Sequence, residues 1–157
     1  MLQKIMSGGQ TGADIAGLDA AIANGIPYGG WLTKDRRTED GPLDDKYQLL
    51  EMETRGDPKR TERNVKKSDG TVIFVQGKLT GGSALTRKYA VKHKKPWLHI
   101  NLKLLTVQKA VIRLEAWVEK EEISVLNVAG RCASKDPEIY DITFTVLNEY
   151  LEKIRRN

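Results

Sequence analysis

The chain has 157 residues, of which 39% are hydrophobic and 30% are charged, as in a globular protein that buries one core. We therefore expect a single domain over residues 1–157. No apolar run approaches the roughly 20 residues that a membrane-spanning helix needs, and residues 1–6 lack the features of a signal peptide. These features predict a cytoplasmic protein without a membrane partner.

The net charge of +5 comes from 26 Lys and Arg against 21 Asp and Glu, and it favours an anionic ligand. The basic residues are spread over several stretches without a nucleic-acid motif, which disfavours nucleic acid as a partner. The single cysteine, Cys132, excludes an internal disulfide. His93 and His99 lack the spacing of a metal-binding pair on a helix, so we predict no metal site.

Strand and helix patterns alternate from the start of the chain. Residues 2–6 form a short apolar run, and apolar residues then recur at helical spacing over 11–24. Residues 28–32 predict a second strand. The polar stretch 34–57 predicts a long loop with at most a short strand near 48–52, and loops of this length are often functional.

The second half of the chain continues the alternation. Residues 58–67 predict a helix with a proline in its first turn, and the continuous apolar run 71–75 predicts a strand covered on both faces. This pattern predicts an α/β, Rossmann-like doubly wound fold with a mostly parallel sheet flanked by helices on both faces. The remaining predicted elements are a helix over 81–94, a strand over 96–100, a helix over 107–119, a strand over 123–128 and a helix over 137–154. In the helix over 81–94, the residues expected to face inward are Ala84, Leu85, Tyr89 and Val91.

Three turns that follow predicted strands combine glycine with small hydroxyl residues, each just before the start of a predicted helix: 7–14, 76–83 and 127–134. In such a sheet, ligands bind beyond the carboxyl ends of the strands. Free N–H groups before a helix form an anion site, although a single glycine turn is also explained by tight turning alone. We expect the three turns to form one phosphate site from the following residues: Ser7, Gly8, Gly9, Gln10, Thr11, Gly12, Asp14, Thr80, Gly81, Gly82, Ser83, Asn127, Ala129 and Gly130.

The first of these turns differs from two well-known nucleotide motifs. Residues 8–12 read Gly-Gly-Gln-Thr-Gly, which does not fit the dinucleotide pattern G-x-G-x-x-G, and no acidic residue clearly ends the second predicted strand. The Gly-Lys-Ser/Thr of a P-loop is also absent. Ordinary NAD binding and ATP hydrolysis are therefore disfavoured.

The long loop and the helix after it place arginines beside acids. Arg37 and Arg60 are candidates for binding a phosphate or a carboxylate. Glu39, Asp40 and Glu62 are the candidate general acids or bases if a bond is broken. An internal network of salt bridges that orders the long loop explains the same residues equally well.

Three further side chains are open to two interpretations each. Trp31 ends the second predicted strand and is a candidate ligand contact, although tryptophans are more often core or interface residues. Asp14 lies near the glycine turn, where it orders that turn, contacts a ligand hydroxyl or is simply solvated. Cys132 is interpreted as a small neutral residue because no histidine lies near it in sequence.

Several motifs together resemble the molybdenum carrier (molybdenum cofactor carrier-like) family, over nearly the whole chain and in order. The resemblance implies a carrier of the molybdenum cofactor, which is a pterin that bears a phosphate. More distantly, the chain is similar to the lysine-decarboxylase-like phosphoribohydrolases and to the Rossmann domain of DNA-processing protein A. The residues that carry the resemblance are 7–14, 29–31, 37–42, 60–65, 68–71, 79–86 and 126–130.

The chain departs from its relatives at two places. After Gly130 the family pattern has Pro-Arg, whereas Arg131 and Cys132 stand here. The phosphoribohydrolases carry a glutamate after their glycine loop, where Arg87 and Lys88 stand here. The resemblance therefore does not extend to hydrolase activity.

Three functions fit these observations. The first is a carrier that holds the molybdenum cofactor (molybdopterin), or a nucleotide-like phosphorylated ligand, and passes it on unchanged. The second is an enzyme that hydrolyses a glycosidic or phosphate bond of a nucleotide. The third is a regulatory sensor that binds a nucleotide and then another macromolecule. Because apolar helices of this fold often pair two copies, we also expect a homo-oligomer.

Overall fold

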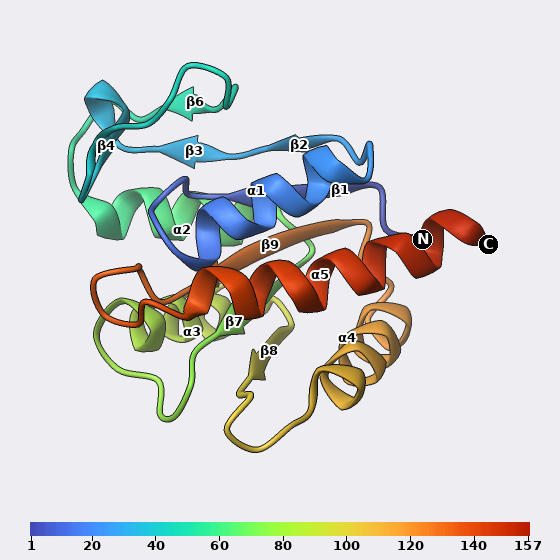
Figure 1. Ribbon diagram of the computed structural model, residues 1–157. Helices are drawn as coiled ribbons and strands as arrows, with labels where there is room; N and C mark the ends of the chain where they lie inside the picture. The colour runs from blue at the N-terminus through green and yellow to red at the C-terminus, as the bar shows by residue number, and fades with distance from the viewer.

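The computed structural model describes residues 1–157, and a five-stranded sheet with helices on both faces forms its centre (Figure 1). The strand order is β2-β1-β9-β7-β8, and every neighbouring pair is parallel. The predicted Rossmann-like α/β fold is therefore confirmed. The strands of this sheet are β1 (Lys4–Ser7), β2 (Tyr28–Gly29), β7 (Gly70–Phe74), β8 (Trp97–Ile100) and β9 (Val125–Gly130).

Five α-helices cover the sheet in two layers. Helices α1, α4 and α5 pack beside one another on one face, and α2 and α3 pack together on the other (Figure 1). None of the helices is both long enough and apolar enough to cross a bilayer. The helices are α1 (Ala13–Ala23), α2 (Asp57–Lys67), α3 (Gly81–Lys92), α4 (Val107–Lys120) and α5 (Ile139–Arg156).

The two faces of the sheet differ in polarity. The main hydrophobic core lies between the sheet and α1, α4 and α5, and it includes Val72 and Phe74 of β7 and Leu126 and Val128 of β9. Alternate residues of a strand point to opposite faces. Asn127 therefore points toward α2 and α3, where its side-chain amide donates to Thr71 Oγ1 at 3.2 Å. This second face carries the polar Thr71 and Asn127 together with the buried Ile73.

The strand predicted over 28–32 is interrupted. It divides at Gly30 into β2 and β3 (Trp31–Leu32), and β3 leaves the main sheet to pair with β6 (Leu50–Glu51). Gly30 has φ +129, and a side chain there would collide with the Ser7 carbonyl. Only glycine fits this crossing. The short strand predicted near 48–52 is confirmed as β6.

The long loop is folded against the body of the protein. A 3-10 helix (Lys34–Arg36) precedes a small hairpin of β4 (Arg37–Thr38) and β5 (Gly41–Pro42). Leu32, Leu43 and Tyr47 are buried against Leu18 of α1 in a second apolar cluster. This cluster anchors the loop against the middle of α1.

Two predictions about the second half of the chain are wrong. The buried residues of α3 are Ser83, Thr86 and Ala90, whereas Val91 is 62% exposed. These small and hydroxyl side chains pack against the more polar face of the sheet. The buried Thr86 hydroxyl has a hydrogen-bond partner, because it donates to the Gly82 carbonyl at 2.9 Å. The third glycine turn does not directly precede a helix, because β9 runs on to Gly130 and α5 begins only at Ile139.

A tight contact joins α1 to the sheet, and it generates a testable prediction. An ideal Cβ at Gly17 would lie 2.9 Å from Val128 Cβ. We expect Gly17→Ala to lower the free energy of unfolding, because overpacking costs about 1–3 kcal/mol and outweighs a helix-propensity gain of about 1 kcal/mol. Urea unfolding measures the effect.

Val128→Ala removes the two γ-methyl groups, which an ideal Cβ at Gly17 would approach to 2.9 and 3.2 Å, and so relieves part of the clash. Gly17→Ala combined with Val128→Ala should therefore lose less stability than the sum of the single changes. Gly56→Ala is the control, because nothing lies within 4 Å of an ideal Cβ at Gly56. Strict additivity of the two changes would contradict the proposed contact.

Candidate functional site

The carboxyl ends of β1, β7 and β9 border a cavity of about 510 Å³. Its size lies within the range of small-molecule sites, roughly 300–1,000 Å³. The three predicted turns and the first turns of α2 and α3 form its walls. The predicted ligand-binding residues that line it are Gly8, Gln10, Asp14, Arg60, Thr80, Gly81, Gly82, Ser83, Asn127, Ala129 and Gly130.

The first glycine turn uses most of its backbone amides internally. Gly9 N–H donates to Ser7 Oγ at 3.2 Å, and Gln10 N–H donates to Asp14 Oδ2 at 3.1 Å. Thr11 N–H donates to Gln10 Oε1 at 3.0 Å. These donors are therefore unavailable to a ligand, and the turn is not an open cradle of amides.

The start of α1 is also occupied by the protein itself. Ala13, the first residue of the helix, donates its N–H to the Arg131 carbonyl at 3.1 Å. Gly12 allows this approach, because an ideal Cβ there would collide with the same carbonyl. The third turn therefore occupies the first amide of α1, whereas the second, of Asp14, has no hydrogen-bond partner.

The N-terminus of α3 is free and faces the cavity. The amides of Gly81 and Gly82, the first two helical residues, have no hydrogen-bond partner in the protein. Thr80 N–H, by contrast, donates to Ser83 Oγ at 3.0 Å. Unpaired amides at a helix N-terminus carry a partial positive charge, so this turn is the part of the cavity best suited to an anion.

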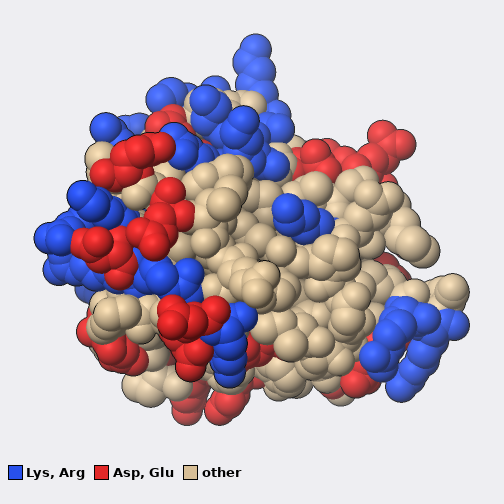
Figure 2. All heavy atoms as spheres, turned by 90° about the horizontal axis from the view of Figure 1, so that it is seen from above, with Lys and Arg blue, Asp and Glu red and all other residues tan.

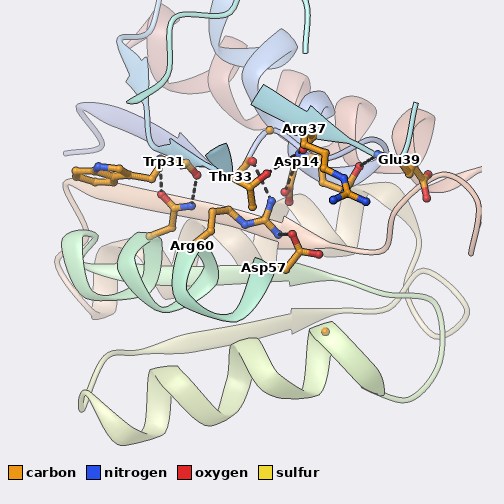
Figure 3. A network of polar contacts seen from close by, with 12 residues as sticks. Asp14, Trp31, Thr33, Arg37, Glu39, Asp57 and Arg60 are labelled. Carbon is orange, nitrogen blue, oxygen red and sulfur yellow. Dashed lines mark hydrogen bonds and ion pairs between the residues drawn. The ribbon is translucent and has the colours of Figure 1, made fainter. Parts of the chain in front are cut away.

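Cations outnumber acids among the lining residues, which include Arg60, Arg131 and Lys135 against Asp14 and Asp57. Arg60 is buried and donates to the Gly8 carbonyl at 3.0 Å, and its guanidinium lies 3.9 Å from Asp57 (Figure 3). Arg131 donates to Thr80 Oγ1 at 2.6 Å. Arg131 therefore ties the end of β9 to the N-cap of α3.

Asp14 is the acid of the cavity with an unusual environment. It is 9% exposed, and burial raises its pKa to about 6, although the charge of Arg60 opposes this increase. Asp57 also raises the pKa by repulsion. The carboxyl of Asp14 therefore titrates close to neutral pH, whereas ordinary aspartates are ionised there.

The remaining predicted ligand residues lie outside the cavity lining. Ser7 is buried, and its hydroxyl donates to the Asp14 carbonyl at 2.9 Å. Gly9 packs against Leu43 and Leu49. Gly12 and Thr11 contact the third turn instead of lining the cavity.

Trp31 and Arg37 belong to the segment that lies above Arg60 and Asp57 in Figure 3. Asn64 binds the backbone of Trp31 through two hydrogen bonds of 2.9 Å, and the Trp31 ring lies 5.8 Å from the guanidinium carbon of Arg63. Arg37 and Glu39 line an adjoining hollow of about 490 Å³, which has Gln10, Asp57 and Cys132 in common with the main cavity. Neither residue is among those that line the main cavity.

Glu39 fastens the long loop to both of its neighbours. Its carboxylate accepts from the Thr11 hydroxyl, from Ser134 N–H at 3.0 Å and from Ser134 Oγ at 2.6 Å. Its own N–H donates to Gln10 Oε1 at 3.0 Å. The hydrogen bonds from Ser134 and Thr11 lower the pKa of Glu39 to about 2. At neutral pH this side chain is an acceptor that orders three segments.

The other two candidate acids also lie away from the cavity. Glu62 of α2 contacts Lys92 Nζ at 2.8 Å and His93 Nε2 at 2.6 Å, and these hydrogen bonds lower its pKa. Asp40 is exposed in the turn between β4 and β5. No group of three His, Cys, Asp or Glu side chains could hold a metal ion.

Several lining residues were not identified from the sequence as site residues. Asn64, Thr61 and Asp57 lie on α2, and Lys135 lies beyond the third turn. Asn64 is 2% exposed, and an amide on the inner side of a predicted helix is a signal that would have found it. The residues around Lys135 do not identify it as a site residue, because it reaches the cavity only through the path of the loop 131–138.

Figure 2 shows how the charged side chains are distributed on one face of the molecule. Lys and Arg lie interspersed with Asp and Glu at the left of this view, further Lys and Arg gather along the upper edge, and uncharged residues cover the middle.

The role of Glu39 is testable by hydrogen exchange. We expect Glu39→Gln to speed amide exchange in residues 34–56 and 131–135, because a neutral acceptor forms weaker hydrogen bonds than a carboxylate. Asp40→Asn is the matched control, since it removes the same charge from a neighbouring exposed side chain. Equal exchange in the two variants would argue against Glu39 as the fastening residue.

Comparisons with known proteins agree with this architecture. The model of the circularly permutated YpsA SLOG family matches residues 5–151. The chain is also similar to a 1.45 Å crystal structure of a "Putative molybdenum carrier protein" from Syntrophus aciditrophicus SB. The TM-score is 0.94 at 51% identity, and the match covers 96% of this chain and 95% of the other. A comparison with curated proteins finds no match.

The structural neighbour confirms the resemblance to molybdenum carriers that the motifs indicate. Since the family model matches nearly the whole chain, the protein belongs to the circularly permutated YpsA SLOG family.

Proposed function

We propose that the protein is a carrier that binds a phosphate-bearing, pterin-like or nucleotide-like molecule in the 510 Å³ cavity and releases it unchanged. The observation that carries this proposal is the pair of unpaired amides at Gly81 and Gly82, which face a cavity with an excess of cations. A phosphate on these amides gains both hydrogen bonds and the field of α3.

The molybdenum cofactor is the ligand that we favour, because the similar crystal structure is named as a molybdenum carrier. The cofactor supplies a flat pterin and a terminal phosphate. The donors of α3 fit the phosphate. Since no cluster of metal-ligating side chains is present, this chain would hold the cofactor through its organic part and its phosphate, not through the metal.

A nucleotide-processing enzyme is the second candidate, and Asp14 is the observation that favours it. Asp14 lines the cavity with a pKa of about 6, which suits a general acid or base. Glu39 and Glu62 do not line the cavity, and their lowered pKa values leave them ionised at neutral pH and make them weaker bases than Asp14.

Mass spectrometry of the small molecule extracted from the protein, purified from its native host, separates the two candidates. A pterin phosphate supports the carrier. A plain nucleotide counts against the molybdenum cofactor as the cargo, and release of base or phosphate from added nucleoside monophosphate would identify the enzyme.

The anion site is testable with a single substitution. We expect Gly82→Leu to weaken binding of adenosine 5′-monophosphate at least tenfold by calorimetry, because the new side chain would occupy the cavity above the free amides. Nothing lies within 4 Å of an ideal Cβ at Gly82, so the fold should tolerate the change. Ala116→Leu, on the exposed side of α4, adds similar bulk and should leave binding unchanged. Unaltered binding in Gly82→Leu would rule out this position for the phosphate.

Anion binding should depend on pH through Asp14. Its ordinary pKa of 3.8 is raised to about 6, so the carboxylate gains a proton as the pH falls from 7 to 5 and its repulsion of an anion disappears. We therefore expect sulfate, whose own charge is constant in this range, to bind several-fold more tightly at pH 5 than at pH 7. Asp14→Asn should remove most of this dependence, and Asp57→Asn should retain it. An identical pH profile in wild type and Asp14→Asn would exclude Asp14 as the titrating group.

A further inference from the structure

Asp14 presents one oxygen that the protein leaves without a partner. Oδ2 accepts the Gln10 N–H at 3.1 Å, but no hydrogen bond reaches Oδ1, and no ion pair involves this carboxylate. Thr143 Oγ1 is the one side-chain polar atom that is both fully sealed and unpartnered, so Oδ1 of Asp14 retains access to the cavity that the residue lines.

The surroundings explain why this oxygen stays unpaired. Arg60 is the cation whose charge lowers the pKa of Asp14. Its guanidinium donates a hydrogen bond to the Gly8 carbonyl at 3.0 Å and lies 3.9 Å from Asp57. Asp57 adds repulsion instead of support. A carboxylate that is about nine-tenths buried is costly unless its lone pairs find donors.

The structural role of Asp14 uses only part of the side chain. An acid in the first turn of a helix is stabilised by the helix dipole, and Oδ2 orders the glycine turn through Gln10. Neither effect requires Oδ1 to point toward the cavity. A ligand donor is what the position lacks.

We propose that Oδ1 of Asp14 is a donor-recognising subsite, which accepts a hydrogen bond from a hydroxyl or N–H of the bound ligand. This inference rests on the proposed function, in which the ligand's phosphate binds at α3. It narrows the ligand class to phosphate monoesters that also carry a hydrogen-bond donor, either on a sugar or on the edge of a heterocycle. Inorganic phosphate would occupy the anion site without using Asp14.

The test compares three probes in wild type and in Asp14→Asn by calorimetry. The substitution keeps an oxygen for the Gln10 N–H and places an amino group where the free acceptor was. Ribose 5-phosphate offers hydroxyl donors, and 2′,3′-dideoxyguanosine 5′-monophosphate offers N–H donors. Inorganic phosphate has no donor group beyond the phosphate itself. We expect Asp14→Asn to weaken at least one donor-bearing probe about tenfold and to leave inorganic phosphate unchanged or tighter.

Asp57→Asn is the matched control, because it removes the same charge from the same cavity at a side chain that is 63% exposed. It should shift all three affinities alike. The probe that is selectively weakened by Asp14→Asn identifies whether the donor is a hydroxyl or an N–H. Should the asparagine variant unfold, Asp14→Ser keeps a short acceptor for the turn and serves the same comparison.

The outcomes separate this subsite from the anion site. If wild type binds all three probes and Asp14→Asn loses none of them selectively, the subsite is wrong and the anion site stands. The same selective loss in Asp57→Asn would also overturn the subsite. If wild type binds no phosphate compound, the proposed function fails, and the subsite fails with it.

Discussion

The close packing of the end of β9 against β7 and the start of α1 is the constraint on which the site depends. A side chain at Gly130 would collide with the Phe74 carbonyl and lie 2.7 Å from Ala13 Cβ. This approach lets the Arg131 carbonyl cap α1 and lets the Arg131 side chain reach Thr80. One glycine at the end of a strand therefore brings all three turns to a single cavity.

The unequal faces of the sheet then decide where a ligand can bind. The face toward α1, α4 and α5 is filled by large apolar side chains, which leave no room. The opposite face carries Thr71 and Asn127, and the buried residues of α3, which covers it, include Ser83 and Thr86. These short polar side chains leave a polar hollow near the N-terminus of α3. Strand alternation thus separates the stabilising side of the sheet from the binding side.

The sequence predicted the fold well because its strong signals are local. The apolar run of β7 and the glycine turns after β1 and β7 are visible without knowledge of the tertiary structure. The predictions that were wrong depend on contacts distant in sequence. The residues around Gly30 do not show that its backbone packs against the Ser7 carbonyl. The sequence of α3 likewise does not show that its small side chains are buried while Val91 is exposed. Which helix amides stay free is equally non-local, since the Arg131 carbonyl binds the first amide of α1 whereas both of the first two amides of α3 are unpaired.

The self-satisfied first turn has a consequence for binding entropy. Because Ser7, Gln10 and Asp14 already hold the amides of residues 9–11, that wall has its final shape before any ligand arrives. Little chain ordering then opposes association, and little structure has to relax when the ligand leaves. A preorganised wall suits a protein that must load and unload the same molecule repeatedly, since the empty and filled states differ chiefly in solvent and not in backbone.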